Sequence, residues 1–374
     1  SGVLPLVEIA KRKRFEEIYV PEDNAEEAAL IRGITIYPVP NLEKLVKHLI
    51  SPKPILVPQK ETEIKIPEQI DERDLADIKG QESAKRGLLI AATGGHNIAL
   101  FGPAGTGKTM LARALTSILP ELSYEEILEV TAIHSISGNL RESYICIPPF
   151  RSPHHTASYV SLVGGGAFPK PGEITLSHRG VLFLDEFPEF ERRVIDALRQ
   201  PLEDKVVSIS RIKGSGLFPA NFILVAALNP CPCGNFGSTK VCICTPKDIG
   251  RYKKKISGPI ADRIDMWIEV PLVKHQVLGE KVKSKSSAEF KREVVSARLH
   301  QEKMYAKKKK KTLNADMGAK EIESLVPLEK SVREILNNSA EKLQLSGRSY
   351  HKIIKLARTI ADLDHSQFVK EKHI

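Results

Sequence analysis

The pattern of apolar and polar residues changes along the chain and divides it into regions. Between residues 71 and 275, short and mostly uninterrupted apolar runs (NIALF, VLFLDEF, NFILVAAL and WIEVPLV) alternate with helical segments such as MLARALTSIL and FERRVIDALRQ. Such runs are typical of strands buried on both faces, so the pattern predicts an α/β domain with a parallel sheet. From residue 276 to residue 374 the strand pattern fades, and helical spacing predicts a small helical domain.

Residues 1–70 have a different pattern. Within residues 1–50, the apolar positions predict a strand at GVLPLVEIA, a helix at DNAEEAALI, a strand at ITIYPV and a helix at LEKLVKHLI. About fifty residues bury little core on their own, so we expect this segment to be part of a larger domain. Residues 51–70 contain four prolines among charged residues, which predicts an extended linker.

The composition excludes several classes of protein. Hydrophobic residues make up 41% and charged residues 27% of the 374 positions, as in a folded globular protein and unlike a disordered or fibrous one. The richest apolar stretch is interrupted by Gly94, Gly95, His96 and Asn97, and no run approaches the roughly 18 residues of a membrane span. We therefore expect a cytoplasmic protein with no membrane partner.

The positive charge is concentrated in one part of the chain. The formal net charge is +10, and the segment from Arg251 to Lys311 alone contains 18 basic and 7 acidic residues, an excess of +11. A concentrated basic segment favours a polyanion such as nucleic acid as the partner. A solvated helix face with no partner is the alternative interpretation.

A phosphate-binding loop is the clearest chemical signal in the sequence. The segment GPAGTGKT has the spacing GxxxxGK[ST], follows the predicted strand NIALF and precedes the predicted helix MLARALTSIL. Its residues are Gly102, Pro103, Ala104, Gly105, Thr106, Gly107, Lys108 and Thr109. The glycines let backbone amides surround phosphate oxygens, Lys108 neutralises phosphate charge, and the Thr109 hydroxyl is a ligand for Mg²⁺. The segment predicts a site for ATP and Mg²⁺, with a plain glycine-rich turn as the alternative.

Two adjacent acids follow a second buried strand. Asp185 and Glu186 come directly after VLFL, and acids in such a position are costly unless they meet a cation or water. We expect Asp185 to hold Mg²⁺ and Glu186 to polarise the attacking water, which makes ATP hydrolysis the predicted activity. Asn229 ends the next apolar strand, where it would orient that water; capping a turn is an equally common role for such an asparagine.

Four of the five cysteines lie within fourteen residues: Cys231, Cys233, Cys242 and Cys244. Four thiolates in a short glycine-containing loop suit tetrahedral Zn²⁺, which can fix a loop too small to have its own core. The Cys-x-Cys spacing is tighter than usual, and reduced free thiols or disulfides are the alternatives. We expect a structural Zn²⁺ ion here, and a small core residue at the isolated Cys146.

Several segments carry a family resemblance in combination. They are the Gly80–Gln81 pair, GPAGTGKT, VLFLDEF, LRQPLED, AALNPCPCG, ISGPIADRIDMWIEVP and SGRSYHKIIKLARTIADL. Together they resemble the ComM/YifB family, within the Mg-chelatase-like branch of the AAA+ ATPases, over nearly the whole chain. The resemblance implies a P-loop AAA+ parallel-sheet core with a C-terminal helical lid domain, preceded by the end of a Lon-protease-like domain whose larger part is missing. It also implies a homohexameric ring that acts on single-stranded or branched DNA, as a branch migration helicase in natural transformation and homologous recombination.

The resemblance assigns roles to residues outside the phosphate loop. Asn229 falls on the sensor-1 position, Arg263 on the arginine finger that reaches a neighbouring subunit's nucleotide, and Arg348 on sensor 2 of the lid. Nucleotide contacts are also implied at positions that flank the loop, namely Gly80, Gln81 and Met110. Judged from the residues alone, Arg263 has the alternative of a salt bridge to Asp262 or Asp265, and Arg348 that of a plain surface position.

Two segments rich in glycine, proline and serine are candidate DNA-contacting loops. The resemblance implies that PPFRSPHHTASYVSLVGGGAFPKPGEITL carries a hairpin that points into the pore of the ring, and KVVSISRIKGSGLFPA is a second candidate hairpin. Their candidates for phosphate contacts are Arg151, His154, His155, Lys170, Arg211 and Lys213, and their candidates for base stacking are Tyr159 and Phe168. Plain connecting loops are the alternative. On a strand, the adjacent histidines would face opposite ways.

Two other functions are compatible with the sequence. The ATPase subunit of a metal chelatase would use the same ATP cycle to drive metal insertion into a porphyrin, but the basic tract from Lys307 to Lys311 would then have no role. A regulatory or protease-associated AAA+ chaperone is suggested by the Lon-like remnant, although residues 1–50 contain no convincing Ser–Lys nucleophile pair.

Overall fold

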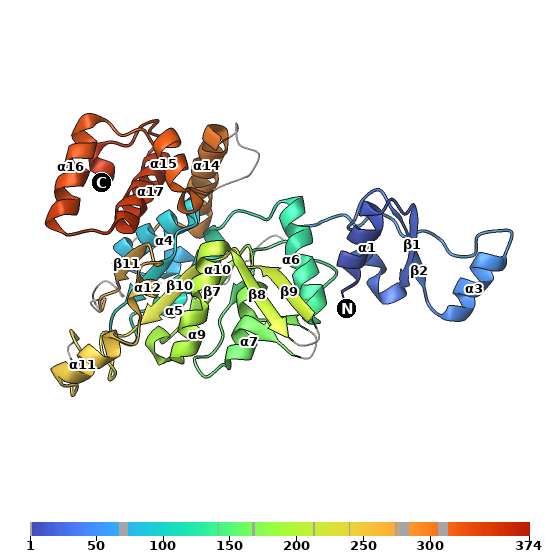
Figure 1. The fold of residues 1–374 in the computed structure, drawn as a ribbon, viewed down its shortest axis with the longest axis horizontal. Helices are drawn as coiled ribbons and strands as arrows, with labels where there is room; N and C mark the ends of the chain where they lie inside the picture. The colour runs from blue at the N-terminus through green and yellow to red at the C-terminus, as the bar shows by residue number, and fades with distance from the viewer. Residues whose placement is uncertain are drawn as a thin grey trace.

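A five-stranded parallel sheet forms the centre of the computed structural model, which describes residues 2–66, 74–140, 142–166, 169–211, 214–238, 240–273, 276, 284–305 and 313–374 (Figure 1). The strands in spatial order are β11 (Met266–Glu269), β3 (Ile98–Phe101), β10 (Ile223–Leu228), β7 (Val181–Leu184) and β4 (Phe150–Arg151). Every pairing within this sheet is parallel. The predicted α/β class with a parallel sheet is therefore confirmed.

Both faces of the sheet are buried, which explains the uninterrupted apolar runs. Ile98 and Leu100 enter one hydrophobic core, whereas Ala99 between them enters another. The first core is completed by α4 (Glu82–Gly94), α5 (Lys108–Ile118) and α14 (Ser287–Tyr305). The second is completed by α7 (Tyr159–Val163), α9 (Arg192–Ala197), α10 (Arg199–Asp204) and α12 (Gly258–Ala261). A strand covered on both sides has no polar face, so its sequence does not alternate.

The first fifty residues form a small unit at the end of the molecule that holds the N-terminus (Figure 1). Its elements are α1 (Val3–Arg12), β1 (Glu17–Pro21), η1 (Glu22–Asn24), α2 (Ala25–Ala28), β2 (Thr35–Val39) and α3 (Leu42–Ile50), with β1 and β2 paired in parallel. The predicted strand at GVLPLVEIA is wrong, because this segment is the helix α1. Leu4 and Val7 are buried one turn apart, and Glu8 pairs with Arg12 four residues later. The sequence pattern also does not predict β1.

Residues 51–66, all of them described, contain neither helix nor strand. Gln59 N donates to Ile36 O, and Thr62 N donates to Ala29 O, so the segment is bonded along the amino-terminal unit. Lys65 N then donates to the Tyr144 hydroxyl, beyond α6 (Tyr124–Ser137). These bonds hold residues 59–65 of the extended segment along the fold.

Helices dominate the carboxyl-terminal region of the described chain. After α14 come η4 (Asn314–Asp316), α15 (Ala319–Leu325), α16 (Lys330–Lys342), α17 (Gly347–Leu363) and η5 (Glu371–His373). Ile354, Ala357 and Ala361 of α17 are buried at helical spacing, and α17 packs on α4 and α14 (Figure 1). Arg358 is fully buried as well, because Asp362 pairs with its guanidinium at 2.6 Å. The predicted helical region is confirmed.

Two antiparallel ribbons lie outside the central sheet. β5 (Gly164–Gly165) pairs with β6 (Lys170–Pro171), and β8 (Val206–Arg211) pairs with β9 (Gly214–Pro219). The remaining short elements are η2 (Leu75–Asp77), α8 (Glu173–Leu176), η3 (Phe187–Glu189) and α11 (Pro246–Lys253). Among the described helices, none combines the length and the apolar character that crossing a bilayer requires.

Candidate nucleotide site and cysteine cluster

The phosphate-loop residues form the turn between β3 and α5, at the carboxyl edge of the sheet. Gly102 N donates to Leu228 O at 3.2 Å, so the loop begins bonded to the neighbouring strand β10. A Cβ atom at Gly102 would lie 2.2 Å from Val270 O, a contact that only glycine avoids. Gly105 and Gly107 have φ angles of 78° and 86°, in the left-handed region. The loop therefore needs glycine at these positions, and it leads into a helix N-terminus that attracts anions.

Lys108 is almost completely buried behind this loop. Its Nζ donates to Gly102 O at 2.7 Å, to Pro103 O at 2.8 Å and to Asn229 Oδ1 at 3.2 Å, and the residue is 7% exposed. Burial lowers the pKa of Lys108, and the charge of Asp185 partly opposes this shift. All three acceptors are uncharged. A buried ammonium group held in this way is well suited to receive an anion.

Thr109 and Asp185 bring two Mg²⁺-type ligands together from different elements. Thr109 lies in the first turn of α5, and Asp185 directly follows β7. Thr109 Oγ1 donates to Asp185 Oδ2 at 2.8 Å. The other carboxylate oxygen, Oδ1, accepts from Glu186 N at 2.9 Å. A hydroxyl and a carboxylate are the hard oxygen donors that Mg²⁺ prefers beside phosphate. The residues present therefore fit this ion.

Glu186 is held by a histidine that sequence reasoning did not connect with it. The φ angle of Glu186 is 50°, a left-handed conformation that is strained for a residue with a Cβ atom. Its Oε2 lies 3.0 Å from His155 Nδ1. His155 follows β4, which pairs with β7, and residues after adjacent parallel strands meet at one edge of the sheet. The sequence did not reveal this contact, because the two-residue strand β4 is too short to be predicted from it.

Gly80, Gln81 and Met110 border the phosphate loop. Gln81 has a φ angle of 60°, and its Nε2 donates to Pro271 O at 2.6 Å and to Thr106 O at 3.4 Å. Its Oε1 is buried without a hydrogen-bond partner among the described residues. Met110 is 55% exposed and lines a cavity of about 310 Å³ together with Asp77, Ile78 and Thr109. All three predicted positions therefore lie near Lys108 and Thr109.

The two predicted catalytic arginines lie at the opposite edge of the sheet. Arg263 comes shortly before β11, whose first residue, Met266, is in register with Ile98 at the start of β3. The phosphate loop follows Phe101 at the other end of β3. Arg348 lies in the first turn of α17 and close to Arg263, since both arginines contact the same carboxylate. Both arginines therefore lie away from the phosphate loop of their own chain.

Glu203 of α10 is the carboxylate that joins the two arginines. Arg263 forms a short ion pair with it, and the Arg348 Nη2–Glu203 Oε1 distance is 3.7 Å. The hydrogen bond from Arg263 lowers the pKa of Glu203. The alternative partners inferred from sequence, Asp262 and Asp265, are wrong. Asp265 instead accepts a hydrogen bond from Asn97 N at 3.0 Å, so its closeness to Arg263 in sequence does not make it the ion-pair partner of that arginine.

Comparison with known proteins identifies the family of this chain. A profile described as Magnesium chelatase, subunit ChlI, matches residues 74–278, and a profile of the C-terminal part of that subunit matches residues 284–374. Competence protein ComM of Haemophilus influenzae is 42% identical over 380 residues, which cover all of this chain and 73% of ComM. The chain belongs to the Mg-chelatase-like AAA+ family of ComM and YifB.

Other relatives show the breadth of this Mg-chelatase-like family. The uncharacterized protein YifB of Escherichia coli is 42% identical over 364 residues, which cover 97% of this chain and 70% of YifB. The magnesium-chelatase 38 kDa subunit of Rhodobacter capsulatus is 28% identical over 172 residues, which cover 41% of this chain and 49% of that subunit. Because the chain belongs to this family, it is an AAA+ ATPase, with ATP and Mg²⁺ as its cofactors.

Several candidate DNA contacts of this Mg-chelatase-like chain have partners within the fold. Arg151 donates from Nε and Nη2 to the two carboxylate oxygens of Glu173, at 2.6 and 2.7 Å. The Arg193 guanidinium lies 4.3 Å from the ring centroid of Tyr159. His154 and His155 lie in a turn and not on a strand, so the opposite orientation expected for strand neighbours does not apply, and their ring centroids are 4.2 Å apart.

The remaining candidates differ in how far the structure describes them. Lys170, on β6, and His154 are exposed. Arg211 ends β8, and only its backbone is described. The other predictions, at Phe168, Lys213 and the tract from Lys307 to Lys311, lie outside the described residues.

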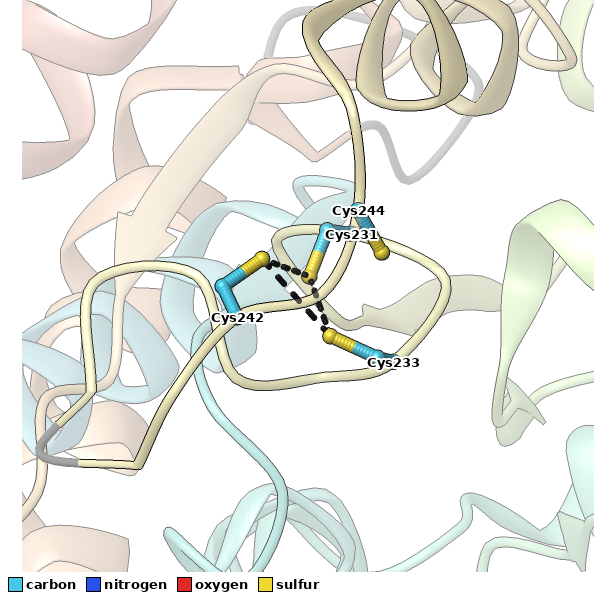
Figure 2. A group of neighbouring side chains, drawn as sticks. All are labelled: Cys231, Cys233, Cys242 and Cys244. Atoms are coloured by element: carbon cyan, nitrogen blue, oxygen red, sulfur yellow. Dashed lines mark hydrogen bonds between the residues drawn. The ribbon is translucent and has the colours of Figure 1, made fainter.

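The four clustered cysteines converge in the loop after β10 (Figure 2). The Sγ atoms of Cys231 and Cys233 are 3.4 Å apart, and Cys242 Sγ lies 3.7 Å from each of them. The four sulfur atoms, including that of Cys244, all lie within 4.8 Å of one another, and no disulfide joins them. Backbone amides of Asn235 and Ile243 donate to Cys233 and lower the pKa of its thiol to about 6. The sequence spacing alone does not show that the four thiols meet.

Proposed function

We propose that this AAA+ ATPase is a DNA motor: a homohexameric ring that encircles or threads single-stranded or branched DNA and moves along it by ATP hydrolysis. In cellular terms it would act in the cytoplasm as a branch migration helicase in homologous recombination and the integration of transforming DNA. The similarity to a relative named Competence protein ComM supports the DNA role. The observation that carries the proposal is the convergence of Lys108, Thr109, Asp185 and Asn229 at one edge of the sheet.

The hydrolytic roles follow from these contacts. The turn from Gly102 to Gly107 would surround the phosphate groups, and Lys108 would exchange a neutral acceptor for a phosphate oxygen. Thr109 and Asp185 would hold Mg²⁺, which when bound neutralises phosphate charge. Glu186 would take a proton from the attacking water once its carboxylate leaves His155, and Asn229 would orient that water. Gly80, Gln81 and Met110 would line the nucleotide pocket.

The position of the two arginines supports a ring. Arg263 and Arg348 lie across the sheet from their own phosphate loop, so they are available to a neighbouring subunit's nucleotide. Glu203 would release them when the phosphate groups of the neighbour compete for the same charges. An arginine that arrives from a neighbour stabilises charge on the transferring phosphoryl group, by on the order of 10³- to 10⁵-fold in rate in other NTPases. Hydrolysis would then depend on assembly.

DNA would meet the ring through its basic segments. The excess of +11 between Arg251 and Lys311 supports a polyanionic partner. The exposed Lys170 and His154 are our main candidates for phosphate contacts from the inserted ribbon. We keep His155, Arg211 and Lys213 as further candidates. Arg151 is a weaker one because Glu173 already neutralises it.

The remaining assignments concern domains and metal. We propose that residues 71–275 form the ATPase core and residues 276–374 its helical lid. Residues 51–70 would link the core to residues 1–50, the end of a Lon-protease-like domain. We also propose a structural Zn²⁺ ion at the four clustered cysteines, whose soft sulfur donors suit it.

Steady-state ATP turnover with and without DNA tests the proposal. Wild-type protein should hydrolyse ATP, and branched or single-stranded DNA should raise the rate. Lys108→Ala should abolish nucleotide binding, whereas Glu186→Gln should bind nucleotide without turning it over. An Arg192→Ala variant, which changes an arginine that is 83% exposed, is the matched surface control. Turnover that DNA does not alter would favour the chelatase or regulatory alternatives, and normal turnover by Glu186→Gln would remove the catalytic assignment.

A further inference from the structure

The loop that carries the four cysteines begins at the nucleotide site itself. Cys231 lies two residues after Asn229, whose Oδ1 accepts from Lys108 Nζ at 3.2 Å. Cys244 is followed by Thr245, the N-cap of α11. The loop from residue 231 to residue 244 therefore connects the end of a core strand with a helix at the edge of the molecule (Figure 1).

The spacing of the sulfur atoms matches a tetrahedral metal site. With a Zn–S bond of about 2.3 Å, two ligands of a tetrahedron are roughly 3.8 Å apart. The sulfur–sulfur distances among Cys231, Cys233 and Cys242 are 3.4, 3.7 and 3.7 Å, much longer than a disulfide bond (Figure 2). The amide of Phe236 also donates to Cys231 Sγ at 3.3 Å. Amide donors of this kind offset the negative charge that four thiolates bring to one ion.

Hydrophobic burial does not account for the shape of this loop. Val241 and Ile243 are each 82% exposed, and Phe236 is 50% exposed. Cys231 is buried, whereas Cys233, Cys242 and Cys244 are half-buried. A loop of fourteen residues with its apolar side chains in solvent needs another source of order. A four-coordinate ion supplies it, since metal binding energy is folding energy in such a small unit.

The cysteine loop also lies beside the phosphate loop. A Cβ atom built at Gly234, whose φ angle is 75°, would lie 3.5 Å from Ala104 Cβ and 3.9 Å from Asn229 Cγ. Phe236 and Gly237 line the same cavity, of about 480 Å³, as Gly102, Pro103 and Asn229. The two loops are therefore packed neighbours. The position of the cysteine loop therefore bears on the shape of the cavity beside the phosphate loop.

We infer that a Zn²⁺ ion bound by Cys231, Cys233, Cys242 and Cys244 fixes this loop against the phosphate loop and thereby positions Asn229 for ATP hydrolysis. The inference rests on the proposed ATPase mechanism for the role of Asn229, but the metal site stands on its own geometry. The ion does not touch the nucleotide. It acts as a second metal requirement beside Mg²⁺, and its ligands are positioning residues.

Metal analysis of the purified full chain tests the first half of the inference. Wild-type protein should contain about one zinc per chain. Replacement of the zinc by Co²⁺ should produce the strong absorption of tetrahedral cobalt–thiolate coordination. Cys242→Ala should lose both signals, Cys242→His should keep the metal because imidazole is also a zinc ligand, and Cys146→Ser is the matched control at a cysteine outside the cluster. A folded native sample with no metal and no cobalt spectrum overturns the inference.

Kinetics of the same proteins test the coupling. Cys242→Ala should lower kcat by on the order of 10- to 100-fold with KM for ATP changed less than about twofold, since small misplacements of catalytic groups have effects of this size. Cys242→His should restore most of kcat. If Cys242→Ala does not fold, removal of zinc from wild-type protein with a chelator, followed by addition of Zn²⁺, should lower and restore kcat. Full turnover without zinc overturns the coupling. Lys108→Ala, which should keep its zinc while losing nucleotide binding, separates failure here from failure of the ATPase proposal.

Discussion

A mixture of two inactive variants tests whether each hydrolytic site is shared between two neighbouring subunits. In our account each site takes Lys108 from one subunit and Arg263 from its neighbour. Arg263 lies across the sheet from its own phosphate loop, beyond a strand of four residues that spans roughly 13 Å. A Lys108→Ala subunit lacks a working loop but still offers its arginine. An Arg263→Ala subunit keeps the loop and offers no arginine.

The expected rates follow from this arrangement. Lys108→Ala alone should be inactive, and Arg263→Ala alone should lose activity by on the order of 10³-fold. In an equal mixture, a site is complete wherever the loop of an Arg263→Ala subunit meets the arginine of a Lys108→Ala neighbour. This is about a quarter of the sites in a randomly mixed ring, so phosphate release should recover to about a quarter of the wild-type rate.

A control mixture corrects for simple dilution. Equal amounts of Lys108→Ala and Arg192→Ala should give about half of the wild-type rate, because every working loop then meets an intact Arg263. Arg192 is 83% exposed on α9 and lies in none of the proposed sites. An Arg263 mixture that remains as inactive as its components, while the control mixture is active, would refute the shared site. So would normal turnover by Arg263→Ala alone.

Three other properties of the chain give independent tests. His155→Ala should raise ATP turnover several-fold in the absence of DNA with nucleotide affinity unchanged, because His155 contacts Glu186 and not the phosphate loop; a lower rate would mean that the histidine assists hydrolysis. A hydrogen bond from His178 lowers the pKa of Glu129 from 4.5 to about 2, so this carboxylate stabilises the fold above about pH 4.5, and that stabilisation is lost as the pH falls towards 2. Thermal unfolding midpoints should drop across this window and drop less steeply in Glu129→Gln; equal slopes would contradict the assignment. DNA affinity should fall steeply as salt rises, through counterion release, and Lys170→Ala should reduce the slope; binding that is insensitive to salt would count against phosphate contacts.

Much of the core was predictable because its physical causes are local. Uninterrupted apolar runs predict strands covered on both faces, and the confirmed sheet contains each of them. The spacing from Gly102 to Thr109 requires a loop between a strand and a helix, and that is where it lies. Residues that follow parallel strands meet at one sheet edge, so Asp185 and Asn229 converge with Lys108 as strand order dictates.

Other features depend on tertiary contacts that a linear pattern does not contain. GVLPLVEIA reads as a strand by composition, yet Leu4 and Val7 are buried at helical spacing in α1. The pairing of Arg263 with Glu203 joins elements sixty residues apart, so the neighbouring acids Asp262 and Asp265 were the wrong partners. His155 contacts Glu186 because the edge strand β4, which precedes it, packs beside β7. This strand has two residues and is too short to be predicted from sequence.

Remodelling of branched DNA is the most direct measure of the proposed motor. A labelled four-way junction should be converted to products by wild-type protein with ATP and Mg²⁺, at a rate that follows ATP turnover. The Glu186→Gln variant should bind the same junction without converting it. Wild-type protein that hydrolyses ATP rapidly in its presence but leaves the junction intact would contradict the account.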